Sequence, residues 1–228
     1  IVALATKKGH VIPEGSGVFR CQGCQATLLT SRELSARCPY CGSAHVIEEE
    51  APDLIAPEGV IPFVVDQAAA ARNFRAWIDR ELGDHPVRTT RVRGLYLPLW
   101  TFDIMGEVRW RGYESANQSS SAGLQVVFGQ GITGGAPAGQ RVVHEGSHYV
   151  LLDDVLVPAT HKVPYALREV FERFDLGQAA PYDPAYLTDW PTEIYEVAVG
   201  DASLVARQRA LQDARREIRV EAEIHAPN

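Results

Sequence analysis

The sequence predicts an α+β protein in two parts: a small N-terminal β unit that contains every cysteine, and a larger domain of helices around an antiparallel sheet. Two observations support this class. All four cysteines lie between residues 21 and 41. Further along the chain, apolar residues alternate with period two in some stretches and recur with helical period in others. With 228 residues, 46% of them hydrophobic, the chain has enough apolar material for one or two cores.

The cysteines form two C-x-x-C pairs with thirteen residues between them. In this spacing each pair makes a tight turn that presents two thiolates to one tetrahedral zinc ion. Gly42, directly after the second pair, can adopt the positive φ that such a turn requires. Four protein sulfurs leave no open coordination position for water. The sequence therefore predicts one structural, non-catalytic Zn²⁺ in a zinc ribbon, with the ligands Cys21, Cys24, Cys38 and Cys41.

Two other uses of these cysteines compete with the metal site. A disulfide framework is typical of small, cysteine-dense proteins from oxidising compartments, and four cysteines in 228 residues are not dense. A thioredoxin-type dithiol needs only one C-x-x-C pair, set in a βαβ unit. Both alternatives fit the spacing less well than zinc does.

Changes in composition predict the domain boundaries. Residues 1–50 are expected to form the zinc ribbon, preceded by a β-hairpin around Lys7 and Lys8. Residues 51–62 are acidic and interrupted by prolines, which indicates a linker. Residues 63–228 are expected to form the α+β domain. Its strands should lie between about three helices, which are predicted to follow Asp66, cover Val163–Phe174 and follow Asp201.

Two sets of aromatic residues are expected to pack within the second domain. Trp77 recurs at helical spacing with other apolar residues, which favours a role as core anchor of the first helix. Tyr182, Tyr186 and Trp190 lie in a segment that three prolines exclude from regular helix. We expect these three rings to fasten that loop onto the domain; a surface for a partner is the alternative.

His144-Glu145-Gly-Ser-His148 matches the H-E-x-x-H signature of zinc proteases. That chemistry requires both histidines on one face of a helix. The apolar residues on either side favour strands, and Glu-Gly-Ser between them favours a turn. A zinc-dependent hydrolase at His144, Glu145 and His148 is therefore only a remote alternative, and the sequence offers no other catalytic constellation.

Charge and hydropathy limit the possible partners. The formal net charge of −7 argues against a broad nucleic-acid surface, and no apolar run approaches the roughly 20 residues of a membrane span. We therefore predict a cytoplasmic, non-enzymatic adaptor or scaffold that acts through protein–protein contacts. Membrane association is the alternative if the natural chain extends beyond these ends. Nucleic-acid binding by the ribbon is the second hypothesis, because basic residues are in excess there: Lys7, Lys8, Arg20, Arg32 and Arg37.

The succession of motifs resembles a bacterial family of zinc-ribbon proteins of the transcription-factor-IIB type, some of them labelled as related to the primosomal replication helicase. The resemblance covers about Cys21 to Ala222. It implies a zinc ribbon, an α+β domain without an assigned reaction and, in some members, C-terminal transmembrane helices. The helicase label does not extend to this chain, which lacks a Walker lysine loop. The segments that carry the resemblance are the Cys-Pro-Tyr-Cys-Gly turn (38–42) and residues 57–63, 93–103, 153–159 and 181–187.

Overall fold

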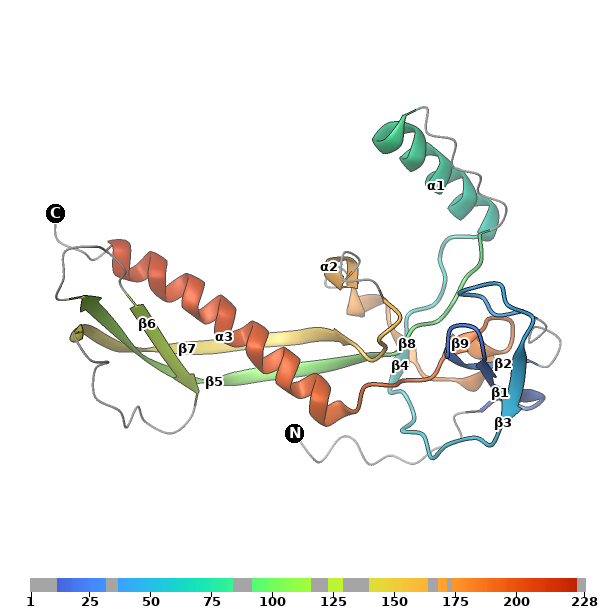
Figure 1. Cartoon of the computed structure of the whole chain (residues 1–228), viewed down its shortest axis with the longest axis horizontal. Helices are drawn as coiled ribbons and strands as arrows, with labels where there is room; N and C mark the ends of the chain where they lie inside the picture. The colour runs from blue at the N-terminus through green and yellow to red at the C-terminus, as the bar shows by residue number, and fades with distance from the viewer. Residues whose placement is uncertain are drawn as a thin grey trace. The chain divides into compact units, whose positions relative to one another are not determined.

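The computed structural model confirms the α+β class, with antiparallel sheets and helices (Figure 1). Two compact units make up the chain: Ile1–Leu99 with Pro158–Val197, here unit 1, and Trp100–Val157 with Ala198–Asn228, here unit 2. The segment expected to link two domains, residues 51–62, lies inside unit 1. The structure describes residues 12–31, 37–83, 92–115, 123–128, 140–163, 168–171 and 174–224. The hairpin expected around Lys7 and Lys8 lies outside these residues.

A four-stranded antiparallel sheet in the order β3-β1-β2-β9 forms the centre of unit 1. Strand β1 (Ser16–Cys21) lies between β2 (Thr27–Ser31) and β3 (Val46–Glu49). The fourth strand, β9 (Thr192–Glu193), comes from the far end of the chain and pairs with β2 (Figure 1). The same late segment completes the core, because Leu187 and Ile194 pack against Val18 and Leu29. The cysteine-bearing strands are therefore stabilised by residues distant in sequence.

A group of aromatic rings joins three segments of unit 1 that are distant in sequence. The rings of Tyr96 and Trp190 both lie 4.7 Å from the ring of Phe63. Tyr182 is half-buried against the core of the four-stranded sheet, whereas Tyr186 is 37% exposed. The predicted packing of the proline-rich segment is thus confirmed for Trp190 and Tyr182, but Tyr186 lies largely at the surface.

Short elements place that segment in unit 1. Two-residue strands, β4 (Gly59–Val60) and β8 (Ala180–Pro181), pair with each other. The 3₁₀ helices η3 (Leu176–Gln178) and η4 (Pro184–Leu187) lie on either side of β8 in the sequence. The prolines exclude an α-helix here, as the sequence predicts, and the chain makes single 3₁₀ turns.

The first predicted helix is confirmed as α1 (Gln67–Leu82), in unit 1. The Asp66 carboxylate accepts a hydrogen bond from the backbone N–H of Ala69 at 2.7 Å, and Gly83 ends the helix with φ of 58°. These are standard N-cap and C-terminal glycine signals. The prediction that Trp77 anchors a core is wrong, because its side chain is 45% exposed and stacks on Phe74 at the surface.

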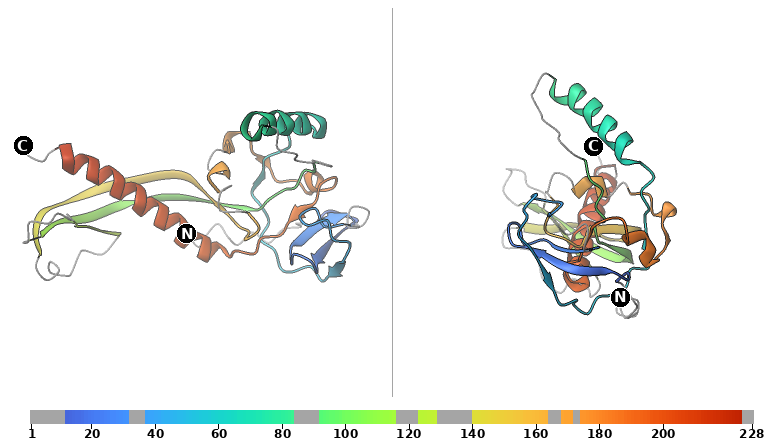
Figure 2. Two further views of the ribbon diagram at one scale, coloured as in Figure 1. Left: turned by 45° about the horizontal axis from the view of Figure 1, so that its top comes forward. Right: turned by 90° about the vertical axis from the view of Figure 1, so that its right-hand side faces the viewer.

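Unit 2 consists of a three-stranded sheet with one long helix packed along it (Figure 2). Strand β5 (Leu99–Ser115) is central, between β6 (Gly123–Phe128) and β7 (Gln140–Pro158). Helix α3 (Val199–Ile224) presents Ala210, Ala214 and Ile218, one turn apart, to the even-numbered residues Val108 and Val150. The small alanines allow the helix to approach the sheet closely. Because α3 packs on the even-numbered residues, it does not cover the odd-numbered face of β5 and β7.

In the residues that the structure describes there are two long helices, α1 and α3, where about three helices were expected. Of the helix expected over Val163–Phe174, the structure describes only a four-residue turn, α2 (Arg168–Phe171). Residues 164–167 and 172–173 lie outside the described residues. Among the helices that the structure describes, none is long and apolar enough to cross a membrane.

Candidate metal centre

The two C-x-x-C turns have the same backbone hydrogen bonds. In the first turn, the Gln25 N–H donates to the carbonyl of Cys21 at 2.8 Å, and the Cys21 N–H donates to the carbonyl of Ala26 at 3.0 Å. In the second turn, the Gly42 N–H donates to the carbonyl of Cys38, and the Cys38 N–H donates to the carbonyl of Ser43, both at 2.9 Å. Each turn therefore closes on itself and holds its two cysteines on the same side.

The residue after each second cysteine has a left-handed backbone. Gly42 has φ of 73°, as the sequence predicts, and Gln25 has φ of 61°. This conformation is rare for a residue with a side chain and costs about 1–2 kcal/mol. The strained position in the first turn could not be predicted from the sequence, because glutamine is not a residue that favours positive φ.

Backbone N–H groups point at the sulfurs. Gly23 and Cys24 donate to the Cys21 sulfur, and the two corresponding residues of the second turn, Tyr40 and Cys41, donate to the Cys38 sulfur. These donors stabilise the negative charge of a thiolate without occupying a position on a metal.

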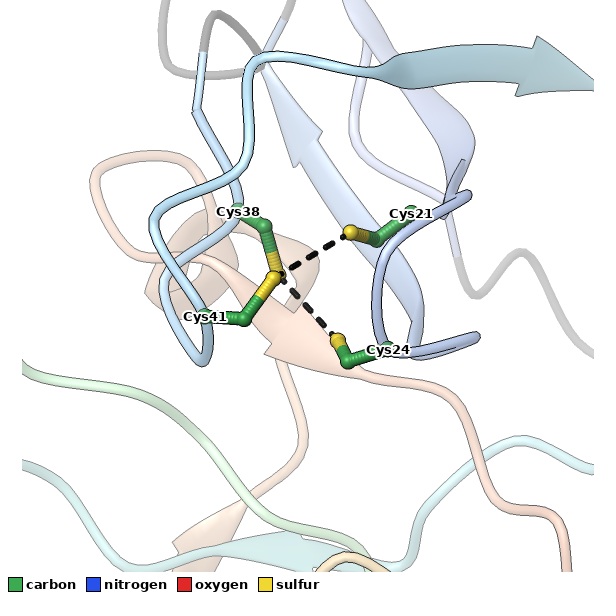
Figure 3. Close-up of side chains that lie close together, drawn as sticks. All are labelled: Cys21, Cys24, Cys38 and Cys41. Atoms are coloured by element: carbon green, nitrogen blue, oxygen red, sulfur yellow. Dashed lines mark hydrogen bonds between the residues drawn. The ribbon is translucent and has the colours of Figure 1, made fainter.

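The four sulfurs converge on one point (Figure 3). The Sγ atoms of Cys21 and Cys41 lie 3.5 Å apart, and those of Cys24 and Cys38 lie 3.6 Å apart. All four Sγ atoms lie within 4.8 Å of one another, and none is in a disulfide. A tetrahedral zinc ion with Zn–S bonds of about 2.3 Å places its sulfurs roughly 3.8 Å apart. The cluster can therefore hold one metal ion such as zinc.

Burial and hydrogen bonding shift the thiol pKa values in opposite directions. Burial raises the pKa of Cys21, but the backbone N–H groups and the neighbouring thiols outweigh burial and lower that pKa to about 6. Burial raises the pKa of Cys38 to about 12, despite its own N–H donors. Four thiolates so close together repel one another, and a divalent cation removes that repulsion. The donor set therefore suits a metal better than it suits four free thiols.

A buried carboxylate lies next to the cysteines. The side chain of Glu193, on β9, is 2% exposed. It accepts hydrogen bonds from the hydroxyl groups of Tyr40 and Thr160, the second at 2.6 Å. Burial raises the pKa of Glu193, against the lowering effect of these two hydrogen bonds. The ammonium group of Lys162 donates to the carbonyl of Cys24 at 2.9 Å. The hydrogen bonds among these residues could not be predicted from the sequence, because they join segments that are far apart in the chain.

Two of the basic residues proposed for nucleic-acid contact are engaged within unit 1. The Arg20 guanidinium lies 3.1 Å from the Glu49 carboxylate, and Arg37 donates to the carbonyl of Gly42 at 3.3 Å. The other three, Lys7, Lys8 and Arg32, lie outside the described residues. Nucleic-acid binding through this set stays a prediction.

The H-E-x-x-H residues lie on a strand. The turn expected at residues 145–147 is wrong, because β7 runs unbroken from Gln140 to Pro158. Gly146 gives the physical reason: a Cβ at this position would lie 2.9 Å from the Trp110 ring, so the missing side chain makes room for that ring on the strand.

The same strand geometry separates the two histidines. Residues four apart on a strand lie roughly 13 Å apart, so His144 and His148 do not meet at one ion. His148 instead contacts Glu217 on α3 at 3.0 Å, and Glu145 contacts Arg111 on β5 at 3.4 Å. This geometry does not supply a hydrolase site.

The described residues contain a second group of convergent ligand atoms, Asp103, Asp153 and Asp154. All three side chains are exposed, and the backbone N–H of Asp154 donates to the Asp103 carboxylate at 3.1 Å. A hydrogen bond with Asp103 raises the pKa of Asp153, and the charges of Asp154 and Asp103 add to the effect. Exposed carboxylates of this kind are common on protein surfaces.

Comparison with known proteins adds one relative. No family profile and no solved structure matches the chain. The chain is similar to the uncharacterized protein YdjG of Bacillus subtilis (strain 168), with 26% identity over 164 residues. The matched region is 67% of this chain and 43% of YdjG, so the chain spans less than half the length of that relative. The zinc-ribbon family remains a prediction from the sequence.

Proposed function

We propose that the protein is a non-enzymatic scaffold in which one structural zinc ion stabilises unit 1 and the open sheet face of unit 2 binds a protein partner. The observation that carries the metal half of this proposal is the convergence of four sulfurs from two matching turns. Four thiolates complete the coordination of zinc, so the ion has no position for water or substrate. The chemistry that zinc supplies here is structural: it neutralises the thiolates and joins the two turns.

The soft donor set favours zinc over harder cations. Thiolate ligands select zinc and other soft ions, whereas magnesium and calcium prefer oxygen. A bound metal would also stabilise unit 1, because the strands near the cysteines are short and share their core with distant segments. In a β unit with so little core of its own, metal binding supplies folding free energy.

The partner-binding half of the proposal is supported by the uncovered face of β5 and β7. Three large apolar side chains lie there, with exposed fractions of 69% for Met105, 64% for Tyr149 and 67% for Leu151. The contacts Arg111–Glu145 and Asp154–Asp103 bracket these side chains on the two strands. An apolar group with charged residues at both ends is typical of protein-interaction sites.

Two measurements test the proposal. Elemental analysis of the purified chain is expected to give one zinc per chain, and two per chain would show that a second site exists besides the four cysteines. For the sheet face, immobilised wild-type protein should retain a stoichiometric partner from a cell extract. Leu151→Lys should lose that partner without a change in melting temperature, because the side chain is exposed.

Gln208→Lys is the matched control, since it adds the same charge to an exposed position of α3, away from the open sheet face. It should retain the partner. Equal retention by wild type and Leu151→Lys would contradict the proposed surface, whatever the zinc content.

A further inference from the structure

The buried carboxylate of Glu193, on β9, joins its own segment of unit 1 to two others. Its donors are Tyr40, which lies between the two cysteines of the second turn, and Thr160, which follows β7. Glu193 itself lies on β9, paired with Leu28 of β2. A buried carboxylate is costly unless hydrogen bonds compensate for the water it loses. Each donor therefore matters to whether these segments stay together.

The first cysteine turn joins the same network through Lys162. The backbone N–H of Lys162 donates to the Thr160 hydroxyl at 3.0 Å, and its ammonium group donates to the Cys24 carbonyl at 2.9 Å. Both metal-binding turns are thus connected to residues 160–162, one through Tyr40 and Glu193 and the other through Lys162. We refer to Tyr40, Thr160, Lys162 and Glu193 as the latch.

The latch adjoins the place where the chain leaves and re-enters unit 1. The chain leaves after Leu99, returns at Pro158 and leaves again after Val197. Ala159 hydrogen-bonds all three passages: its N–H donates to the Pro98 carbonyl at 2.9 Å, and its carbonyl accepts from Glu196 and Val197 at 2.8 and 3.0 Å. Ala159 precedes the latch residue Thr160 directly.

We infer that the latch is metal-dependent: it closes when the four cysteines hold their ion, and it then orders the three passages of chain around Ala159. The physical reason is that the metal fixes two hydrogen-bonding groups on the ribbon side: the Tyr40 hydroxyl, which donates to Glu193, and the Cys24 carbonyl, which accepts from Lys162. When the metal leaves, repulsion and hydration of the thiolates open the turns. Glu193 then loses a donor while still buried, and the segments around it separate to let water in.

This inference rests on the proposed structural metal. It adds that loss of the metal loosens the segments around Ala159 as well as the ribbon itself. Linkage makes the coupling reciprocal. Weakening the latch should therefore also lower the affinity for the metal, so that a lower concentration of chelator removes it.

Hydrogen exchange of the full chain tests the latch, with zinc bound and after chelation. The reporters are the N–H groups of Ile194, Glu196 and Val197, which bond to Thr27 and Ala159. Chelation should speed their exchange by roughly tenfold or more, the effect expected when a hydrogen bond to a charged group is lost. Tyr40→Phe should show the same fast exchange while it still holds one zinc per chain. Tyr186→Phe, at a position 37% exposed, is the matched control and should behave like wild type.

The possible results distinguish the proposed structural zinc from the metal-dependent latch. A wild-type chain without zinc would overturn the proposed function, and the latch with it. One zinc per chain with unchanged exchange after its removal would overturn the latch alone, as would zinc-bound Tyr40→Phe with wild-type exchange. If Tyr40→Phe does not fold, Thr160→Val removes the other donor at nearly constant volume, and the same expectations apply to it.

Discussion

Gly94→Ala should destabilise unit 1 through the aromatic group that holds the proline-rich segment. A Cβ at this position would lie 2.6 and 2.7 Å from two atoms of the Trp190 ring and 3.0 Å from the Phe63 ring. Ordinary carbon–carbon contacts are about 3.5–4.0 Å, so the Trp190 ring would have to move by roughly 1 Å. It cannot move alone, because its ring packs on Phe63, and Phe63 packs on Tyr96.

Overpacking of this kind costs about 1–3 kcal/mol. In a chain of this size each kcal/mol lowers the melting temperature by roughly 2–4 °C, so the expected drop is about 2–12 °C. Thermal unfolding of the zinc-loaded protein, followed by tryptophan fluorescence and circular dichroism, measures this drop. The metal content of the variant should be unchanged, because the clash lies in the aromatic group.

Gly200→Ala is the matched control. Gly200 is in the first turn of α3, and a Cβ there would meet nothing within 4 Å. Alanine is the better helix former, so the melting temperature should stay constant or rise slightly. Equal melting temperatures for Gly94→Ala and Gly200→Ala would refute the tight packing of Trp190 at Gly94.

Three further predictions concern the metal centre and its surroundings. Cys24→Ser should weaken zinc binding by more than the roughly 10–100-fold expected for loss of an outer-shell partner, measured by competition with a chelator, whereas His144→Ala should keep the wild-type zinc affinity; the reverse pattern would contradict the assignment of ligands. Gln25→Val should lose about 1–3 kcal/mol of unfolding free energy, because a β-branched residue tolerates a positive φ poorly, and Gln25→Gly should lose less than about 1 kcal/mol; equal effects in urea titrations would show that φ at this position carries no strain. If the ribbon binds nucleic acid through Arg20 and Arg37, retention of labelled DNA or RNA should fall steeply with salt, and no retention at low salt would remove that hypothesis.

Local signals predicted the parts of the structure that depend on neighbouring residues. The Asp66 cap and the Gly83 stop bound α1 correctly, because the capping groups belong to the helix itself. The two cysteine turns are likewise local, since each closes through hydrogen bonds within six residues. The placement of the four cysteines around one point therefore follows from their spacing.

Contacts between distant segments could not be read in the same way. Nothing near Glu193 in the sequence shows that its carboxylate lies beside Tyr40, because that contact depends on β9 joining β2. Gly146 has the composition of a turn residue, but the strand continues because the Trp110 ring occupies the space of its missing side chain. Trp77 recurs with the other apolar residues of α1 at helical spacing, yet its side chain lies at the surface. Helical periodicity therefore identified an apolar face of the helix but could not show whether another segment covers that face.

X-ray absorption at the zinc edge, combined with elemental analysis of the purified full chain, tests the four-sulfur zinc site directly. We expect one zinc per chain with four sulfur neighbours at about 2.3 Å and no nitrogen or oxygen neighbour. Zinc bound by fewer than four sulfurs would contradict the closed structural site. A chain without metal whose cysteines are joined in disulfides would contradict the metal centre itself.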